Sequence, residues 1–310
     1  MPPDRDLTNR VICITGASAG IGRATALACA RAGMDVVVSA RREDRLLEVA
    51  SEIGKIGRRA LVVVADVADD ASVTHLINQA DRHFGRLDAV LANAGYGITG
   101  GGLDLPEDQI RNIYEVNFFG TLRVLRAALP VMREQGGGHL LLTSSCLARF
   151  PLPYYGHYSA TKAAQSQVGR ALSLELAPEN IDVSVVYPIT TLTEFFDVTA
   201  QNSRVERTGI PEHAPKMFVQ PASRVADAIV RCLKRPRPEV WTSHIVRISA
   251  AMMVAFPWFQ DMAMRKEARR NRHNLLQAAA LNAVEETDAS ALSEAAAHET
   301  REAASGASVS

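Results

Sequence analysis

The amino-acid sequence predicts an α/β fold built on a mostly parallel sheet. Short apolar runs typical of buried strands alternate with longer helical segments over most of the 310 residues. The first of these runs leads directly into a glycine-rich loop and an alanine-rich helix. Because a helix follows each strand, consecutive strands are expected to lie parallel and to be joined by right-handed crossovers.

Seven apolar runs are expected to form the strands. They are residues 11–15, 35–39, 59–65, 87–92, 139–143, 181–187 and 239–243. The first helix is expected to follow the glycine-rich loop and to end near Gly33. The later helices are expected at residues 43–56, 70–84, 106–134, 155–176 and 221–233, and Pro106 opens the longest of them. We find no internal repeat and no domain boundary before about residue 245.

The composition argues against several classes of protein. Lys and Arg together number 34, as do Asp and Glu, so the formal net charge is zero, whereas a general nucleic-acid binder needs a basic excess. The four cysteines are far apart and form no C-x-x-C pair, which argues against a zinc site or a disulfide framework. The polar N-terminus lacks a signal-peptide core, and no run reaches the ~18 uncharged apolar residues of a membrane span. We therefore expect a cytoplasmic protein.

A glycine-rich loop follows the first expected strand. It reads Gly16-Ala17-Ser18-Ala19-Gly20-Ile21-Gly22. Glycines let a backbone turn tightly and approach a pyrophosphate, and the helix N-terminus then offers amide hydrogens and the positive end of its dipole. Strand, glycine loop and helix form the context that a dinucleotide-binding site requires. The alternative is an ordinary strand-to-helix turn.

A second pattern begins at the carboxyl end of the fifth expected strand. Thr143-Ser144-Ser145 is followed, after twelve residues, by Tyr158, and Lys162 comes four residues later. In a helix this spacing places Tyr158 and Lys162 on one face, one turn apart. A neighbouring ammonium favours the phenolate, so the phenol can exchange a proton near neutral pH while a serine hydroxyl holds the substrate oxygen. The alternative is a chance arrangement of common surface residues.

Four signals stand in one order along the chain. They are Thr15-Gly16-x-x-x-Gly20-x-Gly22, Asn93-Ala94-Gly95, Ser145, and Tyr158-x-x-x-Lys162. Together they resemble the short-chain dehydrogenase/reductase family, and the resemblance covers residues 8–245. It implies a single catalytic domain with a doubly wound, seven-stranded Rossmann-type sheet and a nicotinamide cofactor. It also implies an oxidoreductase that interconverts a carbonyl and an alcohol by hydride transfer.

The resemblance implies a catalytic quartet of Asn117, Ser145, Tyr158 and Lys162. The separation of thirteen residues before Tyr158 selects Ser145 rather than Ser144. In the family the serine positions the substrate oxygen, and the tyrosine is the general acid/base. The lysine lowers the pKa of the tyrosine and binds the nicotinamide ribose. The asparagine bends the long helix and holds a water that links the lysine to solvent; the alternative is a buried asparagine satisfied by backbone.

The resemblance also implies the contacts of the cofactor, without a metal. Asn93 and Gly95 are expected near the adenine-side ribose and the neighbouring strand. Asp66 is expected to accept a hydrogen bond from adenine, with Val67 beside the ring, although a solvated carboxylate is the alternative. The full set is Gly16, Ser18, Ala19, Gly20, Ile21, Gly22, Arg41, Arg42, Asp66, Val67, Asn93, Ala94, Gly95, Tyr158, Lys162, Pro188, Ile189 and Thr193.

The end of the second strand favours NADP(H) over NAD(H). A site that prefers NAD places a carboxylate there to hold the ribose 2′-hydroxyl. This chain instead has Ser39-Ala40-Arg41-Arg42. Arg41 is placed to bind a 2′-phosphate through its planar guanidinium, and Arg42 can assist, although a solvated arginine pair is the alternative. Ala19 stands where many NADP-using relatives carry a second basic residue.

One position departs from the family pattern. After the sixth strand relatives usually have Pro-Gly, whereas this chain has Pro188-Ile189. Thr193 still stands where a threonine normally touches the cofactor. Because the family contacts near residue 189 are made largely by backbone, we expect Ile189 to be tolerated and to narrow the space beside the nicotinamide.

Residues 96–103, 146–155 and 190–216 are expected to form the substrate side, with the third segment as a mobile lid. The last two segments and their surroundings are rich in apolar side chains. These include Leu147, Phe150, Leu152, Tyr155, Leu192, Phe195, Phe196 and Met217. We therefore expect a lipophilic alcohol or ketone as substrate, the alternative being that these residues only pack the lid.

After about residue 245 the sequence changes character. Residues 246–280 form an apolar/basic extension, in which the run 250–259 is followed by five basic residues within 265–272. It can cover the substrate entrance or pack on a partner subunit, lie on a membrane surface as an interfacial helix, or have no role. We favour docking, because Arg247 and Pro257 interrupt the apolar face. Residues 281–310 are rich in Ala, Glu, Ser and Thr and are expected to be disordered.

Two classes of function fit this sequence. The first is an NADP(H)-dependent oxidoreductase that acts on a small-molecule carbonyl/alcohol pair. The second is a non-catalytic NADP(H)-binding sensor of the same fold, which would not need Tyr158 and Lys162 together. We expect no nucleic-acid partner. The resemblance implies a homodimer or homotetramer paired through the two long helices, near residues 106–134 and 155–177.

Overall fold

A seven-stranded parallel sheet forms the centre of the computed structural model, which describes residues 4–195, 198–199 and 219–272. Its strands lie in the order β3-β2-β1-β4-β5-β6-β9, and every neighbouring pair is parallel. They are β1 (Val11–Thr15), β2 (Asp35–Ala40), β3 (Ala60–Val64), β4 (Ala89–Ala92), β5 (Gly138–Thr143), β6 (Ile181–Tyr187) and β9 (Glu239–Trp241). The predicted parallel sheet is confirmed.

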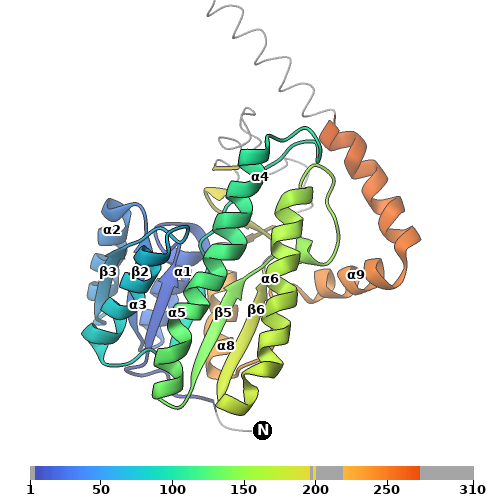
Figure 1. Ribbon diagram of the computed structural model, residues 1–310. Coiled ribbons are helices and arrows are strands. Elements are labelled where there is room, and N and C mark those ends of the chain that lie inside the picture. The colour runs from blue at the N-terminus through green and yellow to red at the C-terminus, as the bar shows by residue number, and fades with distance from the viewer. Residues whose placement is uncertain (1–3, 196–197, 200–218, 273–310) are drawn as a thin grey trace, which may run out of the picture.

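Helices cover both faces of this sheet. In Figure 1, α3, α5 and α6 lie on the face toward the viewer, and α1, α2 and α8 pack on the other face. The helices are α1 (Gly20–Arg31), α2 (Glu43–Lys55), α3 (Asp70–Phe84), α4 (Glu107–Tyr114), α5 (Gly120–Glu134), α6 (Gly156–Glu175), α8 (Ala222–Lys234) and α9 (His244–Ala255). The fold is therefore doubly wound, as the sequence predicts.

The strand order reverses between β1 and β4. From β1 the chain runs outward to β2 and β3, and it then returns to β4 and continues through β5, β6 and β9 to the other edge. At such a point the connections that follow the two neighbouring strands run in opposite directions. They leave a crevice between them, beyond the carboxyl ends of the strands. The fold thereby places the glycine loop after β1 beside the loop after β4.

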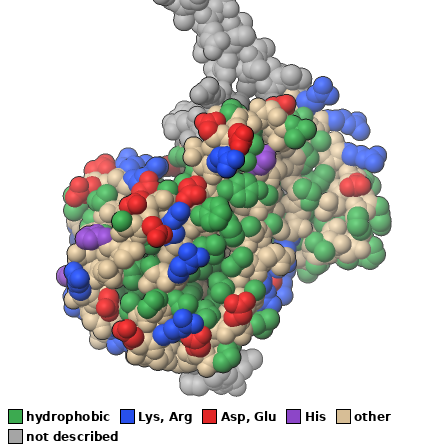
Figure 2. All heavy atoms as spheres, viewed as in Figure 1, with side chains coloured by type: hydrophobic (Ala, Val, Ile, Leu, Met, Phe, Trp, Pro, Cys, Tyr) green, Lys and Arg blue, Asp and Glu red, His purple; other side chains and the backbone are tan. Residues whose placement is uncertain are grey.

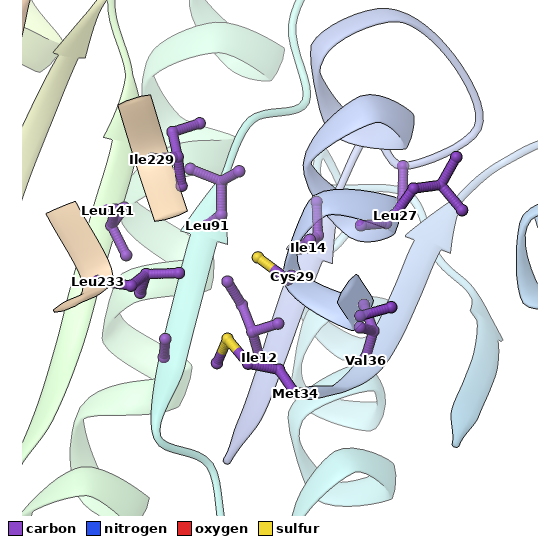
Figure 3. Packing of buried hydrophobic residues seen from close by; sticks show 14 of the residues in the cluster. Ile12, Ile14, Leu27, Cys29, Met34, Val36, Leu91, Leu141, Ile229 and Leu233 are labelled. Carbon is purple, nitrogen blue, oxygen red and sulfur yellow. The ribbon is translucent and has the colours of Figure 1, made fainter. Parts of the chain in front are cut away.

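Two hydrophobic cores hold the layers together. Alternate residues of a strand point to opposite faces, so β1 contributes to both cores. Ile12 and Ile14 pack with residues of α1 and α8, as Figure 3 shows. Val11 and Cys13 face the core under α3 and α5. All five residues of β1 are buried, which explains why this strand reads as a continuous apolar run.

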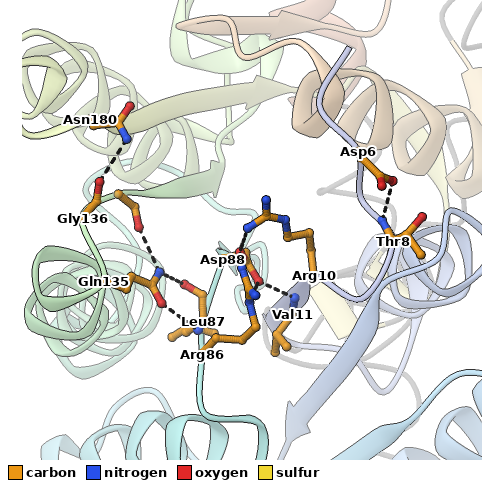
Figure 4. A network of polar contacts seen from close by, with 11 residues as sticks. Asp6, Thr8, Arg10, Val11, Arg86, Leu87, Asp88, Gln135, Gly136 and Asn180 are labelled. Carbon is orange, nitrogen blue, oxygen red and sulfur yellow. Dashed lines mark hydrogen bonds and ion pairs between the residues drawn. The ribbon is translucent and has the colours of Figure 1, made fainter. Parts of the chain in front are cut away.

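Polar contacts fix the amino ends of the strands, away from the crevice. Asp88 accepts hydrogen bonds from Arg10, Arg86 and the amide of Val11 at 2.7–2.8 Å, as Figure 4 shows. Burial raises the pKa of Asp88, but these bonds outweigh burial and hold its pKa below the ordinary value. This network anchors β1 against the start of β4.

The long helix expected at residues 106–134 is divided. Pro106 precedes α4, and a π-helical turn at Glu115–Phe119 separates α4 from α5. Asn117 lies in the middle of this turn. A π-turn inserts an extra residue into the helical hydrogen-bond ladder and is frequent at functional sites.

A small second sheet lies beside the expected lid and was missed by the sequence analysis. It pairs β7 (Thr190–Leu192) with β8 (Val219–Pro221) in parallel. Strands of three residues are too short to show an alternating pattern. Much of the expected lid, with Phe196 and Met217, lies outside the described residues.

The described part of the C-terminal extension consists of two helices. Strand β9 ends at Trp241, earlier than expected, because the Ser243 side chain accepts a hydrogen bond from the amide of Val246 at 3.3 Å and caps α9. A second helix covers residues 257–272. Residues 273–310, including the expected disordered tail, lie outside the described residues. Among the helices that the structure describes, none is long and apolar enough to cross a membrane.

Candidate active site

A cavity of about 860 Å³ opens at the carboxyl ends of the strands. The ends of β1, β2, β3, β4 and β5 line it, together with α6, the loop after β6 and the helix at 257–272. Of the residues that the sequence places at the site, all except Gly22 and Asn117 border this cavity. The fold thus brings together residues from most of the chain.

The glycine loop lies at one end of the cavity. Gly16 and Gly20 have φ angles of +66° and +53°, which favour glycine. A Cβ on Gly22 would lie 2.2 Å from the carbonyl oxygen of Gly16, so no larger residue fits there. Ala19 precedes α1 and gives no side-chain cap, which leaves the amide groups of the first turn for a ligand. These features fit the pyrophosphate of a dinucleotide.

A set of hydrogen bonds joins the ends of β1, β4 and β5. The Thr15 hydroxyl accepts from the amides of Asn93 and Ala94 at 3.0 and 3.2 Å. The Asn93 side chain donates to the Thr15 carbonyl at 3.1 Å and accepts from the Thr143 hydroxyl at 3.1 Å. Asn93 therefore braces three strand ends, in agreement with its expected contact to the neighbouring strand.

The two arginines after β2 have different interaction partners. Arg41 has an exposed side chain and lies 3.9 Å from the Asp66 carboxylate. Arg42 donates to the Ser18 hydroxyl at 3.2 Å and pairs with Glu194 at 3.1 Å. Arg41 is consequently the more available of the two for an anionic group in the cavity.

Tyr158 and Lys162 lie one turn apart on α6, at the other end of the cavity. Their side chains are buried, and the Lys162 ammonium is 5.7 Å from the centroid of the Tyr158 ring. Lys162 donates to the Thr143 carbonyl at 2.9 Å, which ties α6 to the end of β5. The Phe195 ring lies 5.4 Å from the Tyr158 ring, between centroids.

The two serines after β5 have different partners. The Ser144 hydroxyl donates to the Lys162 carbonyl at 2.7 Å. The Ser145 hydroxyl accepts from the Leu147 amide at 3.2 Å, and it interacts with the Tyr158 phenol, whose pKa it lowers. Ser145 is therefore the serine whose hydroxyl interacts with the Tyr158 phenol, and it is also the serine that the family resemblance implies.

Burial controls the pKa values of the tyrosine–lysine pair. It raises the pKa of Tyr158, against the lowering effect of the hydrogen bond with Ser145. Burial also lowers the pKa of Lys162 to about 7. From the sequence we expect the Lys162 ammonium to lower the pKa of the phenol, but in the structure burial destabilises the phenolate and the ammonium alike. Tyr158 is therefore protonated at neutral pH.

Asn117 is fully buried beside this pair. Its side chain accepts from the Tyr96 amide at 3.0 Å and donates to the Tyr96 carbonyl at 2.9 Å. Its own carbonyl accepts from Gln165 at 2.7 Å. A Cβ on Gly95 would lie 2.8 Å from the Asn117 side-chain oxygen. These contacts satisfy most of the buried Asn117 side chain through backbone, and they hold the Gly95–Tyr96 segment near Lys162. The expected role of Asn117 in holding a water stays a prediction.

The loop after β6 closes the cavity on a third side. The Pro188 carbonyl accepts from the Cys146 amide at 3.0 Å, and Ile189 is buried beside it. Thr193 lies over the glycine loop, because a Cβ on Gly20 would be 3.0 Å from the Thr193 methyl group. Its hydroxyl accepts from the Phe195 amide at 3.2 Å.

The family model for short chain dehydrogenases matches residues 10–204, which is more than half of the chain. The chain belongs to this family.

Relatives and solved structures agree with this assignment. L-rhamnose 1-dehydrogenase (NAD(P)(+)) of Sphingomonas sp. strain SKA58 is 32% identical over 232 residues, which cover 71% of this chain and 91% of the relative. A short-chain type dehydrogenase/reductase from Mycobacterium marinum superposes with a TM-score of 0.69 at 29% identity, over 76% of this chain and 94% of that one. An alcohol dehydrogenase from the archaeon Thermococcus sibiricus, complexed with 5-hydroxy-NADP, gives 0.65 at 31% identity, over 75% and 95%.

In this short-chain dehydrogenase, two cavity residues come from the C-terminal extension and were missed by the sequence analysis. Glu267 and Asn271 line the cavity, and the Asn271 side chain donates to the Pro153 carbonyl at 3.1 Å. Burial, with a smaller contribution from the Glu267 charge, raises the pKa of Tyr155 to about 12. No local motif marks Glu267 or Asn271, because their place depends on how the extension packs.

Ser144 and Ser145 provide a matched pair of substitutions. Ser145→Ala is expected to lower turnover by about 10²–10³, the usual effect of removing a hydrogen-bond donor to a reacting oxygen. Ser144→Ala leaves the Lys162 carbonyl without its side-chain donor, so we expect a loss of stability of about 1–3 kcal/mol with most of the turnover retained. Steady-state kinetics and thermal unfolding of both variants distinguish these outcomes. A larger loss of turnover in Ser144→Ala would exchange the roles of the two serines.

Proposed function

We propose that this short-chain dehydrogenase is an NADP(H)-dependent oxidoreductase that interconverts a carbonyl and an alcohol on a lipophilic small molecule. The observation that carries the proposal is that Ser145, Tyr158 and the buried Lys162 line the same cavity as the glycine loop, with the Lys162 ammonium 5.7 Å from the Tyr158 ring centroid. The activity in the name of the Sphingomonas relative supports it, as does the complex of the Thermococcus alcohol dehydrogenase.

The bound nicotinamide would supply or accept the hydride, and the chain itself handles the proton and the oxygen. A protonated Tyr158 donates its proton to the carbonyl oxygen during reduction and accepts one from the alcohol during oxidation. The Ser145 hydroxyl holds the same oxygen in place. As the proton leaves Tyr158, negative charge develops on its oxygen, and the Lys162 ammonium stabilises that charge. Thr143 and Asn117 act as positioning residues, because their contacts fix Lys162 and the Gly95–Tyr96 segment beside it.

The residues around the glycine loop support a dinucleotide with a 2′-phosphate. No acidic residue stands at the end of β2, and Arg41 extends there with an exposed guanidinium. Asp66 lies near it, and Val67 is buried beside Gly120. We propose that the adenine ring lies against Val67, with the phosphate bound by Arg41. Arg42 would then orient Ser18 and Glu194 rather than bind phosphate itself.

Arg41→Ala is expected to weaken NADPH binding and to leave NADH binding nearly unchanged. Losing a charge-assisted hydrogen bond costs roughly 1.5–3 kcal/mol, which corresponds to a Kd about 10 to 150 times larger. Fluorescence titration of the two dinucleotides measures the effect. Arg45→Ala is the matched control, because Arg45 is another arginine of this loop–helix region and contacts Glu48 instead. Superimposable NADPH titrations for Arg41→Ala and wild type would contradict the phosphate assignment.

The wall around Tyr158 supports a lipophilic substrate. Leu147, Leu152, Phe195 and Ile189 line the cavity, and Leu147 and Phe195 pack with Tyr158. The added side chain of Ile189 is buried, so it narrows the space at this end of the cavity. Glu267 and Asn271 add polar groups to the cavity wall. A ketone with an apolar body and one polar end fits these surroundings.

We also propose a homo-oligomer that pairs through the long helices. Figure 2 shows hydrophobic side chains gathered over α4, α5 and α6, and Phe119 and Leu174 are 47% and 73% exposed on this face. Large apolar patches of this kind mark protein interaction sites. Pairing of two copies through α5 and α6 would cover them.

Turnover of carbonyl compounds tests the proposed activity. Wild-type protein with NADPH is mixed with a panel of aliphatic and aryl ketones and aldehydes, and the nicotinamide absorbance is followed. We expect consumption of NADPH with at least one apolar member of the panel. Tight NADPH binding without turnover of any compound would instead favour the non-catalytic sensor.

A further inference from the structure

The C-terminal hairpin, defined as α9 with the helix at residues 257–272, carries an unusual concentration of exposed apolar side chains. Of the thirteen large hydrophobic side chains that are exposed among the described residues, seven lie on this hairpin. They are Ile245, Ile248, Met252, Val254, Phe256, Trp258 and Met262. A large exposed patch of apolar side chains marks a site that interacts with a protein or a membrane.

The inner side of the hairpin is fixed to the catalytic domain. Val246 and Ala250 of α9 are buried, and Asn271 donates to the Pro153 carbonyl at 3.1 Å. The hairpin therefore has a defined place on the molecule, and docking through the inner side leaves the apolar residues around the turn at 256–258 uncovered. Pro257 does not interrupt an apolar face, because it begins the second helix after this turn.

Basic side chains stand beside the apolar ones. Residues 244–272 contain six Arg or Lys against two Asp or Glu, a formal charge of +4 in a chain whose net charge is zero. Four of the basic side chains are exposed on the second helix, namely Arg265, Lys266, Arg269 and Arg272. In Figure 2 the lobe formed by the hairpin shows hydrophobic side chains at its lower corner and basic side chains along its upper edge.

We propose that the C-terminal hairpin docks the protein on an anionic lipid membrane. The apolar side chains around Phe256 and Trp258 enter the headgroup region, and the basic side chains at 265–272 contact the phosphate groups. Tryptophan prefers this boundary between apolar and wet surroundings. An anionic membrane is the partner that complements both the apolar turn and the basic edge.

Two other partners for the C-terminal hairpin fit less well, namely a second copy of the chain and the segment beyond residue 272. In a symmetric pair of copies, the same surface would meet itself, and two patches of charge +4 would repel one another. The chain beyond residue 272 has six acidic and one basic residue and could neutralise the charge. It has no Trp, Phe, Tyr, Met or Ile, however, so it offers little to cover the apolar side chains.

Membrane docking would also place the cavity near lipid. The second helix of the hairpin carries Glu267 and Asn271 on the cavity wall, so the cavity and the docking surface share one element. This consequence rests on the proposed function, because it applies to a lipophilic substrate that reaches the cavity from the membrane. The docking itself can be tested without any turnover.

Co-sedimentation with vesicles tests the docking. The full chain is mixed with vesicles of phosphatidylcholine alone or with added phosphatidylserine, at low and high salt. We expect binding to the anionic vesicles that weakens as salt rises. The double variant Arg265→Glu/Lys266→Glu is expected to bind at least about tenfold more weakly, since each basic residue near an anionic surface contributes about fivefold. Trp258→Ser is expected to weaken binding at every salt concentration.

Matched controls separate docking from a general effect of the substitutions. Leu47→Ser and Arg31→Glu change one exposed apolar residue on α2 and one exposed basic residue on α1. Both variants are expected to bind the vesicles like wild type. Circular dichroism and NADPH titration check that every variant is folded. Failure of the full chain to bind either vesicle would overturn the proposal, as would equal, salt-independent binding to both. Self-association that Trp258→Ser abolishes, without vesicle binding, would assign the patch to a second copy instead.

Discussion

Tyr158→Phe is expected to lower turnover by about 10²–10⁴, the scale of general acid–base catalysis, while NADPH binding persists. The substitution removes only the phenolic hydroxyl, and the buried ring keeps its packing against Phe195. The raised pKa keeps wild-type Tyr158 protonated at neutral pH, so the loss should appear in ketone reduction under ordinary assay conditions. Steady-state kinetics with a reactive ketone, together with NADPH titration, measures both properties.

The control for this prediction is Tyr155→Phe. Tyr155 is three residues earlier, lines the same cavity and is partly buried, but it lies beside Glu267 rather than Lys162. The same chemical change at Tyr155 should therefore cause a much smaller loss of turnover. Near-native turnover of Tyr158→Phe would contradict the role of the phenol as the proton carrier.

Lys162→Met should also abolish most of the turnover, by at least about 10², because no positive charge then stabilises the developing phenolate. Methionine has a similar length and suits a buried site, so the fold should survive. The pKa of Lys162 can also be tested without an activity assay, through the pH dependence of the free energy of unfolding. Its pKa is about 7 in the folded protein and 10.5 in the ordinary reference state.

The sign of the stability effect follows from this lowered pKa. Between about pH 7 and pH 10.5 the unfolded chain holds a proton on Lys162 that the folded chain has lost. The free energy of unfolding of the wild type should therefore rise with pH relative to Lys162→Met, by on the order of a few kcal/mol across this window. Urea unfolding at several pH values measures the difference, with the exposed Lys55→Met as control. A difference that does not change with pH would show that Lys162 keeps an ordinary pKa.

The sheet could be predicted from the sequence because the signal for it is local. Most strands of the large sheet contain a short apolar run, and alternation with helices leaves few other topologies. Strands β7 and β8 were missed because Thr190–Leu192 and Val219–Pro221 are short and contain no apolar run. The place of Asn117 in the long helix was expected, and the π-turn supplies the structural reason for its position.

The features of the site that depend on packing were harder to predict from the sequence. The spacing of Tyr158 and Lys162 predicted a shared helix face, but only the structure shows that burial raises the pKa of the phenol. The pair Arg41 and Arg42 looked alike in the sequence, and the partners of Arg42 distinguish them. Glu267 reaches the cavity through the docking of the extension, which no local pattern encodes.

The most direct test of the central claim is the stoichiometry of a single reaction. Wild type and Tyr158→Phe are incubated with NADPH and the most reactive ketone of the panel, and the alcohol formed is quantified beside the NADPH consumed. The proposed function predicts one alcohol for each NADPH with wild type and almost none with Tyr158→Phe, although both bind NADPH. Binding of NADPH by wild type without formation of any alcohol would contradict it.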